Sequence, residues 1–348
     1  MSPPILITAL VVTLGTAMPN SPSDSLWLPT AAAVVRSAPV CAEYWPGFWS
    51  PEPEFMLTRK SDEGMLLVTT GPVPPGWQPL LGDSVPRELL GRSYVRYGFP
   101  GQFRGFHISH TLGDRTLPAV PAEYYSVENN VLVLIHEAFH AYQHEAFARS
   151  APLPTTLLNT ADLDLPEHFA RAEVERRILA QVLQTPGELE RARLLKRYLT
   201  TRELRMRSLP ELRSREQWEE RVEGTAEWVG LSCAAAAVHA PEDHVRLALL
   251  RGLAEPKVPL VGGRHVKFRA YAVGAALATV LENLGVTWRQ RVVEGVALDE
   301  LLAEALGWNS TGLDTDADRE WREEYGFSEL LMEFSEATPF PGLGAGSL

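Results

Sequence analysis

The apolar positions along the chain follow two different patterns, which change near residue 125. From about residue 24 to 125, short apolar runs such as 65–70 and 93–98 are separated by proline and glycine, which is typical of short strands. Residues 105–120 alternate around a Gly-Asp pair, which predicts one or two more strands and a turn. We therefore expect a small β-rich subdomain over residues 24–125.

A helical period begins at Ser126, a suitable N-cap residue that is followed by Glu128 in the first turn. This helix should continue to about Phe147, and its interior run 131–135 is apolar on every face, which predicts a helix buried in the body of the protein. The same period predicts further helices near residues 167–184, 187–207, 215–239, 242–253, 266–285, 298–306 and 316–336.

These elements predict an α+β fold with a larger, mainly helical domain over residues 126–338 and an active site between it and the β-rich subdomain. Residues 166–210 would form a helical insertion, and residues 339–348 a mobile tail. The insertion is rich in charge, with Glu173/Arg177 and Glu203/Arg207 at i,i+4 spacing, so we expect its arginines to lie on a solvated face.

The N-terminal residues 1–23 contain an apolar stretch, 5–14, of the length found in signal peptides. No lysine or arginine precedes it, since the first basic residue is Arg36, so export and a cytoplasmic location both stay open. A buried N-terminal segment of the mature protein is the other interpretation. No later run of 18 apolar residues occurs, and we expect no integral membrane insertion.

The formal net charge of −12 indicates a protein that does not bind nucleic acid, because phosphate binding needs a concentrated positive surface. Cys41 and Cys233 are the two cysteines, which excludes a disulfide-rich scaffold and a cysteine-built zinc site. They could pair in an exported protein. Alternatively, Cys233 is a small buried residue unrelated to Cys41.

The candidate chemistry begins with His136, Glu137 and His140, which spell H-E-x-x-H inside the predicted buried helix. The i,i+4 spacing places both imidazoles on one helix face, where they can bind one zinc ion, and Glu137 beside them can activate a zinc-bound water. Ionisable groups in an apolar helix are costly unless an opposite charge compensates them, which favours a cation. The alternative is that all three are core residues without a metal.

Two histidines leave a tetrahedral zinc ion in need of a third protein ligand. The metzincin pattern would place a histidine at position 146, which is Ala146 here, so that pattern is excluded. His144 lies a further turn along the helix, about 6 Å of rise from His140, which makes it an awkward third ligand. We interpret His144 and Glu145 as residues around the ligands or as helix surface.

A second motif, R-V-E-G-T-A-E-W at residues 221–228, changes this picture. H-E-x-x-H followed by E-G-x-A-x-aromatic resembles the gluzincin superfamily of zinc peptidases, particularly the peptidase MA-like and aminopeptidase-N-like families. The resemblance implies a zincin-like fold, Glu223 as third zinc ligand, Glu227 as the carboxylate that orients a ligating imidazole, and Trp228 in place of the family's tyrosine. Glu227 could instead face solvent or exchange roles with Glu223. The gap between the motifs is longer than in thermolysin or aminopeptidase N, and residues 166–210 would fill it.

A gluzincin also needs a donor for the oxyanion formed at the scissile carbonyl. Tyr271 is our candidate, because the small residues at 274–276 allow its helix to pack closely. His265 and Arg264 are alternatives, and Tyr271 could equally be an ordinary core aromatic.

The aromatic residues before the first strands allow two interpretations. They could line a substrate groove or close one side of a core; the residues are Tyr44, Trp45, Phe48, Trp49 and Phe55.

The sequence therefore predicts a Zn²⁺-dependent hydrolase, a metallopeptidase in which Glu137 activates zinc-bound water to cleave a peptide or protein substrate. The alternative is a non-catalytic zinc-binding protein of zincin fold, used for structure or partner recognition.

Overall fold

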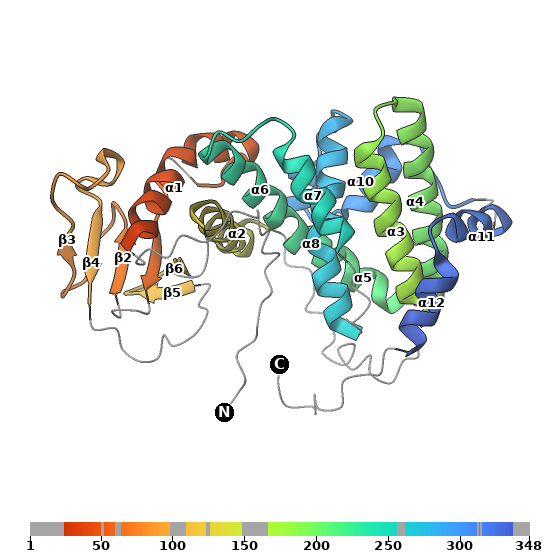
Figure 1. Ribbon diagram of the computed structural model, residues 1–348, viewed down its shortest axis with the longest axis horizontal. Helices are drawn as coiled ribbons and strands as arrows, with labels where there is room; N and C mark the ends of the chain where they lie inside the picture. The colour runs from red at the N-terminus through yellow and green to blue at the C-terminus, as the bar shows by residue number, and fades with distance from the viewer. Residues whose placement is uncertain are drawn as a thin grey trace. The chain divides into compact units, whose positions relative to one another are not determined.

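The computed structural model describes residues 24–49, 52–59, 64–97, 109–122, 126–147, 166–255, 262–311, 313 and 315–336. The chain forms two compact units: the first comprises Met1–Ala146 and Val229–Val245, and the second Phe147–Trp228 and Arg246–Leu348. Helices predominate, and a six-stranded sheet is formed by the N-terminal part (Figure 1), so the expected α+β class is confirmed. The predictions for residues 1–23 and 339–348 lie outside the described residues.

The first unit contains the sheet, in the order β3-β4-β2-β1-β6-β5. β1 and β6 pair in parallel and the other neighbours are antiparallel. The predicted runs at 65–70 and 93–98 are β2 and β4, and Gly113, with φ of 67°, is at the turn between β5 and β6. The strands are β1 (Phe55–Arg59), β2 (Gly64–Val68), β3 (Gln78–Pro79), β4 (Ser93–Arg96), β5 (Ser109–Leu112) and β6 (Arg115–Pro121).

Both faces of the central strands are buried, which explains their continuous apolar character. Met56 of β1 and Leu67 of β2 are paired and belong to an apolar cluster with Trp77. Leu57 and Leu66 are the next pair, and because side chains alternate along a strand they lie on the opposite face, where both are fully buried.

Helix α1 (Asp24–Tyr44) was not predicted, and it corrects the expectation that residues 24–125 are β-rich throughout. Pro29 and Pro39 lie inside it, and proline removes a helical hydrogen bond, so local propensity argues against a helix here. Tertiary burial outweighs this effect: residues 31–34 are almost fully buried, and α1 packs against α2.

Helix α2 (Val127–Ala146) has the predicted start and environment. The Ser126 hydroxyl accepts a hydrogen bond from the Asn129 N–H at 3.2 Å, as an N-cap does. Val131, Leu134 and Ile135 are fully buried, and the helix packs against both α1 and β6. The motif H-E-x-x-H therefore lies on a helix held from several sides.

The aromatic residues that follow α1 form a core against α2. Trp45 and Phe48 are buried and contact the Phe139 ring edge-on, with ring centroids 4.9 and 5.0 Å away. Phe55 is fully buried as well. The core interpretation of these side chains is confirmed, and the groove interpretation is wrong for these three.

Cys41 and Cys233 form a disulfide, with their Cα atoms 5.4 Å apart. They join α1 to α6 (Thr225–Ala237) across 192 residues of sequence, and both are fully buried. Of the two alternatives for these residues, pairing is therefore the one that the structure contains.

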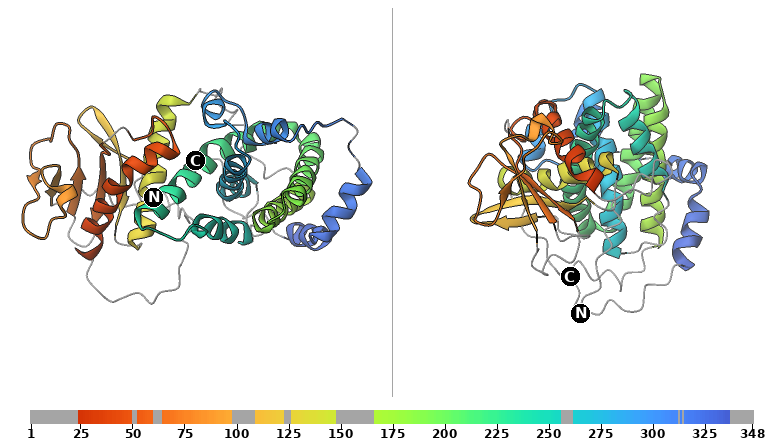
Figure 2. Two further views of the ribbon diagram at one scale, coloured as in Figure 1. Left: turned by 90° about the horizontal axis from the view of Figure 1, so that it is seen from above. Right: turned by 60° about the vertical axis from the view of Figure 1, so that its left-hand side comes forward.

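The helices of the second unit follow the predicted ranges closely, and α3 and α4 run side by side in every view (Figure 2). The range 316–336 contains two helices, separated at Gly326 with φ of 72°, and α9 (Arg289–Val293) was not predicted. No helix in the described part of the chain is long and apolar enough to cross a membrane. The helices are α3 (Pro166–Gln184), α4 (Glu188–Ser208), α5 (Pro210–Glu219), α8 (Gly262–Asn283), α10 (Leu298–Ala305), α11 (Thr315–Glu324) and α12 (Phe327–Glu336), while α7 (His244–Ala254) begins in the first unit and continues into the second.

The charges of α3 and α4 do not all lie on a solvated face, which corrects the prediction. Glu173 is fully buried and binds Arg176 and His265 instead of Arg177. Only the second predicted pair, Glu203–Arg207, forms at the surface, at 3.2 Å. Further arginines on α4 are buried and pair with carboxylates of neighbouring helices. The sequence of α4 alone suggests that these side chains are solvated, but their charges are compensated by other helices.

The buried Glu173 should make the stability of this unit depend on pH. Burial alone would raise the pKa of Glu173, but the hydrogen bonds and charges of His265 and Arg176 outweigh it and lower that pKa from 4.5 to about 2. A folded-state pKa below the unfolded value stabilises the fold above pH 4.5, and this contribution, on the order of 3 kcal/mol, is lost as the pH falls from 4.5 to 2.

We therefore expect Glu173→Gln to lower the free energy of unfolding most at neutral pH, and the difference from wild type to shrink as the pH falls from 4.5 to 2. Urea unfolding at several pH values measures both free energies. A difference that stays constant over this range would contradict the assignment.

Candidate metal centre

Helix α2 brings His136 and His140 together one turn apart. Their Nε2 atoms lie 3.0 Å from each other, and the rings are edge-on with centroids 4.6 Å apart. Two nitrogens bound to one zinc ion at about 2.0–2.1 Å in tetrahedral geometry would be about 3.3 Å apart. The two imidazoles are therefore close to the arrangement that one cation requires.

Gln143 fixes the orientation of His140, and the sequence interpretation did not include it. Its Oε1 lies 2.7 Å from His140 Nδ1, and Gln143 is 4% exposed. An amide oxygen only accepts, so Nδ1 donates the hydrogen and the Nε2 lone pair stays available to a metal. The signal in the sequence was the i+3 spacing from His140, which places Gln143 on the same helix face.

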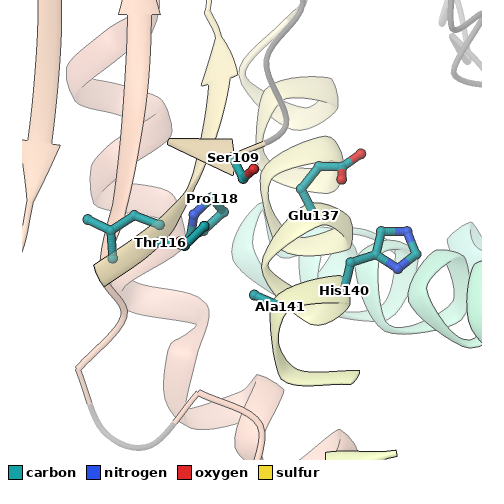
Figure 3. A pocket seen from close by; sticks show the side chains of 7 residues that line it. Ser109, Thr116, Pro118, Glu137, His140 and Ala141 are labelled. Atoms are coloured by element: carbon teal, nitrogen blue, oxygen red, sulfur yellow. The ribbon is translucent and has the colours of Figure 1, made fainter. Parts of the chain in front are cut away.

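Glu137 and His140 line a cavity of about 200 Å³ in the first unit. Ala141 of α2 completes the helix side, and the opposite side is formed by β5 and β6 (Figure 3). The cavity has room for about one side chain, and most of its lining is apolar. The strand residues are Ser109, Thr116, Leu117 and Pro118.

The three residues that the resemblance implies as ligands form one group of possible donor atoms. His136, His140 and Glu223 each offer one ligand atom, and these atoms all lie within 4.8 Å of one another. Glu223 is 7% exposed and His136 is 5% exposed. Two imidazoles and a carboxylate are a donor set that zinc commonly takes.

Glu223 belongs to η5 (Glu220–Gly224), a π-helical segment that packs against α8. Its Oε1 lies 3.2 Å from Lys267 Nζ. A Cβ atom at Gly224 would overlap the backbone of Gly274, so the two backbones are in direct contact. This contact explains why both positions are glycine.

Tyr271 lies on the same helix as these contacts. Lys267, Tyr271 and Gly274 are spaced i, i+4 and i+7, so they share the face of α8 that meets η5. The Tyr271 ring stacks on Phe268, with centroids 6.4 Å apart. Its role as oxyanion donor stays a prediction.

Glu227 is 5% exposed, so the interpretation that it faces solvent is wrong. Three residues further along α6, a Cβ atom at Gly230 would lie 3.2 Å from the Leu132 carbonyl oxygen and 3.5 Å from His136 Cβ. Helical spacing places Glu227 one turn before Gly230 on that same face. Its hydrogen bond to a ligating imidazole stays a prediction. Trp228 packs edge-on against Trp288, with centroids 5.4 Å apart.

The other candidates of the sequence lie elsewhere. His144 and Glu145 are exposed, as expected for helix surface. His265 is 1% exposed, its Nε2 lies 3.1 Å from Glu173, and its ring contacts Phe169, so this side chain belongs to the helical core and is not an oxyanion donor. The side chain of Arg264 lies outside the described residues.

Removal of the Gln143 acceptor should weaken metal binding. Gln143→Leu keeps a similar volume but leaves His140 free to rotate or change tautomer, and loss of such an orienting bond typically costs 10- to 100-fold in metal affinity. Gln143→Glu keeps an acceptor and should retain the affinity. Competition with a chromophoric chelator gives the zinc dissociation constants, and equal values for wild type and a folded Leu variant would exclude this role.

Comparison of the chain with protein-family models gave no match, and searches of curated proteins and of solved structures gave none either. The gluzincin resemblance therefore depends on the two short motifs alone. Any conclusion about function has to come from the geometry of the residues described above.

Proposed function

We propose that the protein is a zinc-dependent hydrolase that cleaves peptide bonds. The observation that carries the proposal is the convergence of His136 and His140, whose Nε2 atoms lie 3.0 Å apart in a buried helix. Glu137 lies between them in the sequence and is the candidate general base. It lines the cavity that His140 also lines.

The donor set favours zinc over other common cations. Two imidazole nitrogens and one carboxylate suit zinc, whereas magnesium and calcium are bound mainly through oxygen. Glu223 would complete a set of three protein ligands, the number that catalytic zinc sites have. When bound, the cation would supply a Lewis acid and lower the pKa of a coordinated water toward neutrality.

The chain's own residues would handle the protons. Glu137 would accept a proton from the attacking water and return it to the leaving amine, which needs a carboxylate beside the ligands that is not itself a ligand. Tyr271 would donate a hydrogen bond to the oxyanion of the tetrahedral intermediate. Both groups act on atoms of substrate and water, so their removal should affect turnover more than metal content.

A peptide substrate is supported by the strand beside the cavity. Of the described strands, β5 is the last on its side of the sheet, and its residues Ser109 and Thr111 are exposed. An edge strand offers main-chain donors and acceptors to a further extended chain. A peptide paired there would run beside the cavity that Glu137 lines, and one of its side chains could enter the cavity.

Metal content tests the site. We expect about one zinc ion per wild-type chain by plasma mass spectrometry after reconstitution, and a sharp loss in His140→Ala and Glu223→Ala, because each variant removes one of three ligands. Gln290→Ala, at an exposed position on α9, is a control that should keep its zinc. No zinc in the wild type would refute the proposal, and loss in His140→Ala alone would show that Glu223 is not the third ligand.

Turnover tests the catalytic role. Glu137→Gln preserves size and the ligands, so it should keep zinc and lose peptide cleavage by several orders of magnitude, because an amide cannot accept the proton of water at neutral pH. Digestion of a broad peptide library, read by mass spectrometry, compares the two proteins. Zinc binding without cleavage by the wild type would favour a non-catalytic zinc protein instead.

A further inference from the structure

A π-helical turn interrupts the helix that carries Glu223. α5, η5 and α6 follow one another without a break, and η5 provides the five residues of the π-helical turn. A π turn is wider than an α turn and is less stable in isolation, so it persists where surrounding contacts hold it, often at functional sites. Glu223 is the fourth residue of this turn, so the contacts that hold the turn also affect the position of the Glu223 side chain.

The first residue of the turn, Glu220, is held by two arginines from other helices. Arg202 of α4 donates from Nη1 and Nη2 to the two carboxylate oxygens of Glu220, at 3.0 and 2.7 Å. Arg269 of α8 donates from Nη2 to Glu220 Oε1 at 3.1 Å. All three side chains are at least 97% buried, so neither water nor salt competes for these bonds.

Both arginines are themselves anchored. Arg202 Nε donates to Asp299 of α10 at 2.7 Å, and Arg269 binds Glu216 of α5. Glu220 is therefore linked to α4, α8 and α10 at once. A rotation of the turn would break several charge-assisted bonds without any solvent to replace them.

The rest of the turn is held by close backbone contacts. The Thr225 hydroxyl donates to the Arg221 carbonyl at 2.6 Å, which satisfies an acceptor whose partner changes in a π turn. Gly224 touches the backbone of Gly274, and a Cβ at Gly274 would overlap the Glu220 carbonyl. Between these two fixed ends, the Glu223 carboxylate lies 3.2 Å from Lys267 Nζ.

We propose that Arg202 and Arg269 are positioning residues for the metal centre: they hold Glu220, and through it the π-helical turn that directs Glu223 toward the metal. The inference rests on the proposed function, because it assigns a purpose to the turn only if Glu223 is a ligand. Among the carboxylates that Arg202 and Arg269 bind, Glu220 is the one within the π turn, three residues before Glu223.

Arg205 is a matched control within the same network. It is fully buried on α4, one turn from Arg202, and it binds Glu175 and Glu216 through all its nitrogens. The carboxylates that it binds belong to α3 and α5 and lie outside the π turn. Arg202→Lys and Arg205→Lys each replace a bidentate guanidinium with a single ammonium, but the first removes direct bonds to Glu220, whereas the second acts on it only indirectly, through Glu216 and Arg269.

The experiment measures zinc affinity by chelator competition and, with Co²⁺ in place of zinc, the visible absorption that reports the ligand geometry. Circular dichroism and thermal melts check the fold. We expect Arg202→Lys to weaken zinc binding about 10- to 100-fold and to change the Co²⁺ spectrum, as loss of outer partners does. Arg205→Lys should melt at a similarly reduced temperature while its affinity and spectrum stay near those of wild type.

Gly274→Ala tests the same turn without a change of charge, and it decides the matter if Arg202→Lys does not fold. The new methyl group would displace the Glu220 carbonyl, so this variant should also bind zinc more weakly and alter the Co²⁺ spectrum. Wild-type affinity and spectrum in a folded Arg202→Lys or Gly274→Ala protein would overturn this inference and leave the metal site intact. A wild type that binds no metal would overturn the proposed function and this inference with it.

Discussion

Paired charges fill the centre of the second unit, where an apolar core would be expected. Arg202, Arg205 and Arg269 are almost fully buried and bind carboxylates from α3, α5, η5 and α10. Burial of each ion costs several kcal/mol, which only good geometry and complete hydrogen bonding recover. The result adds little net stability compared with an apolar core, but it restricts the helices to one arrangement, since a guanidinium fork accepts carboxylates only in defined directions. The π-helical turn is one consequence of this restriction.

The first unit fixes its helix by a different means. α2 is surrounded by apolar and aromatic side chains, and its polar residues are satisfied individually: Ser126 caps its start, and Gln143 binds His140. Dense packing leaves few rotamers to each side chain, so the helix that carries the two imidazoles is fixed mainly by apolar contacts. The disulfide between Cys41 and Cys233 adds a covalent link between α1 and α6.

Most helices and the predicted strands could be found from the sequence because their signals are local. The capping serine, the apolar period of α2 and the Gly-Asp turn of the β5–β6 hairpin each depend on a few neighbouring residues. α1 could not be found in this way, since Pro29 and Pro39 argue against a helix and only its burial against α2 overrides them. The prediction of a solvated face for the charged helices was wrong for a related reason: burial there also depends on other helices and not on local sequence. The sequence of α4 shows arginines beside glutamates, and nothing local reveals that Arg202 and Arg205 face the interior.

The residues of the candidate site also differ in whether local sequence could identify them. His136, Glu137 and His140 follow from spacing within one helix, whereas Glu223 came only from a resemblance, because no local pattern links it to the histidines. The i+3 spacing of Gln143 from His140 could be seen in the sequence, but its role could not be predicted without knowing that the side chain is buried. The arginines that hold Glu220 could not be predicted from the sequence, because they belong to α4 and α8, which are distant from Glu220 along the chain.

The two kinds of restraint should respond differently to solution conditions. Apolar packing of α2 weakens on cooling and is insensitive to pH, whereas the charge cluster depends on the ionisation of its carboxylates. Salt should affect neither strongly, because buried pairs are poorly screened. In a metal centre with two ligands on an apolar helix and one on an ionic turn, the histidines and Glu223 would therefore be positioned by different kinds of restraint. The packing of α2 would control the imidazole pair, and the charge cluster the carboxylate.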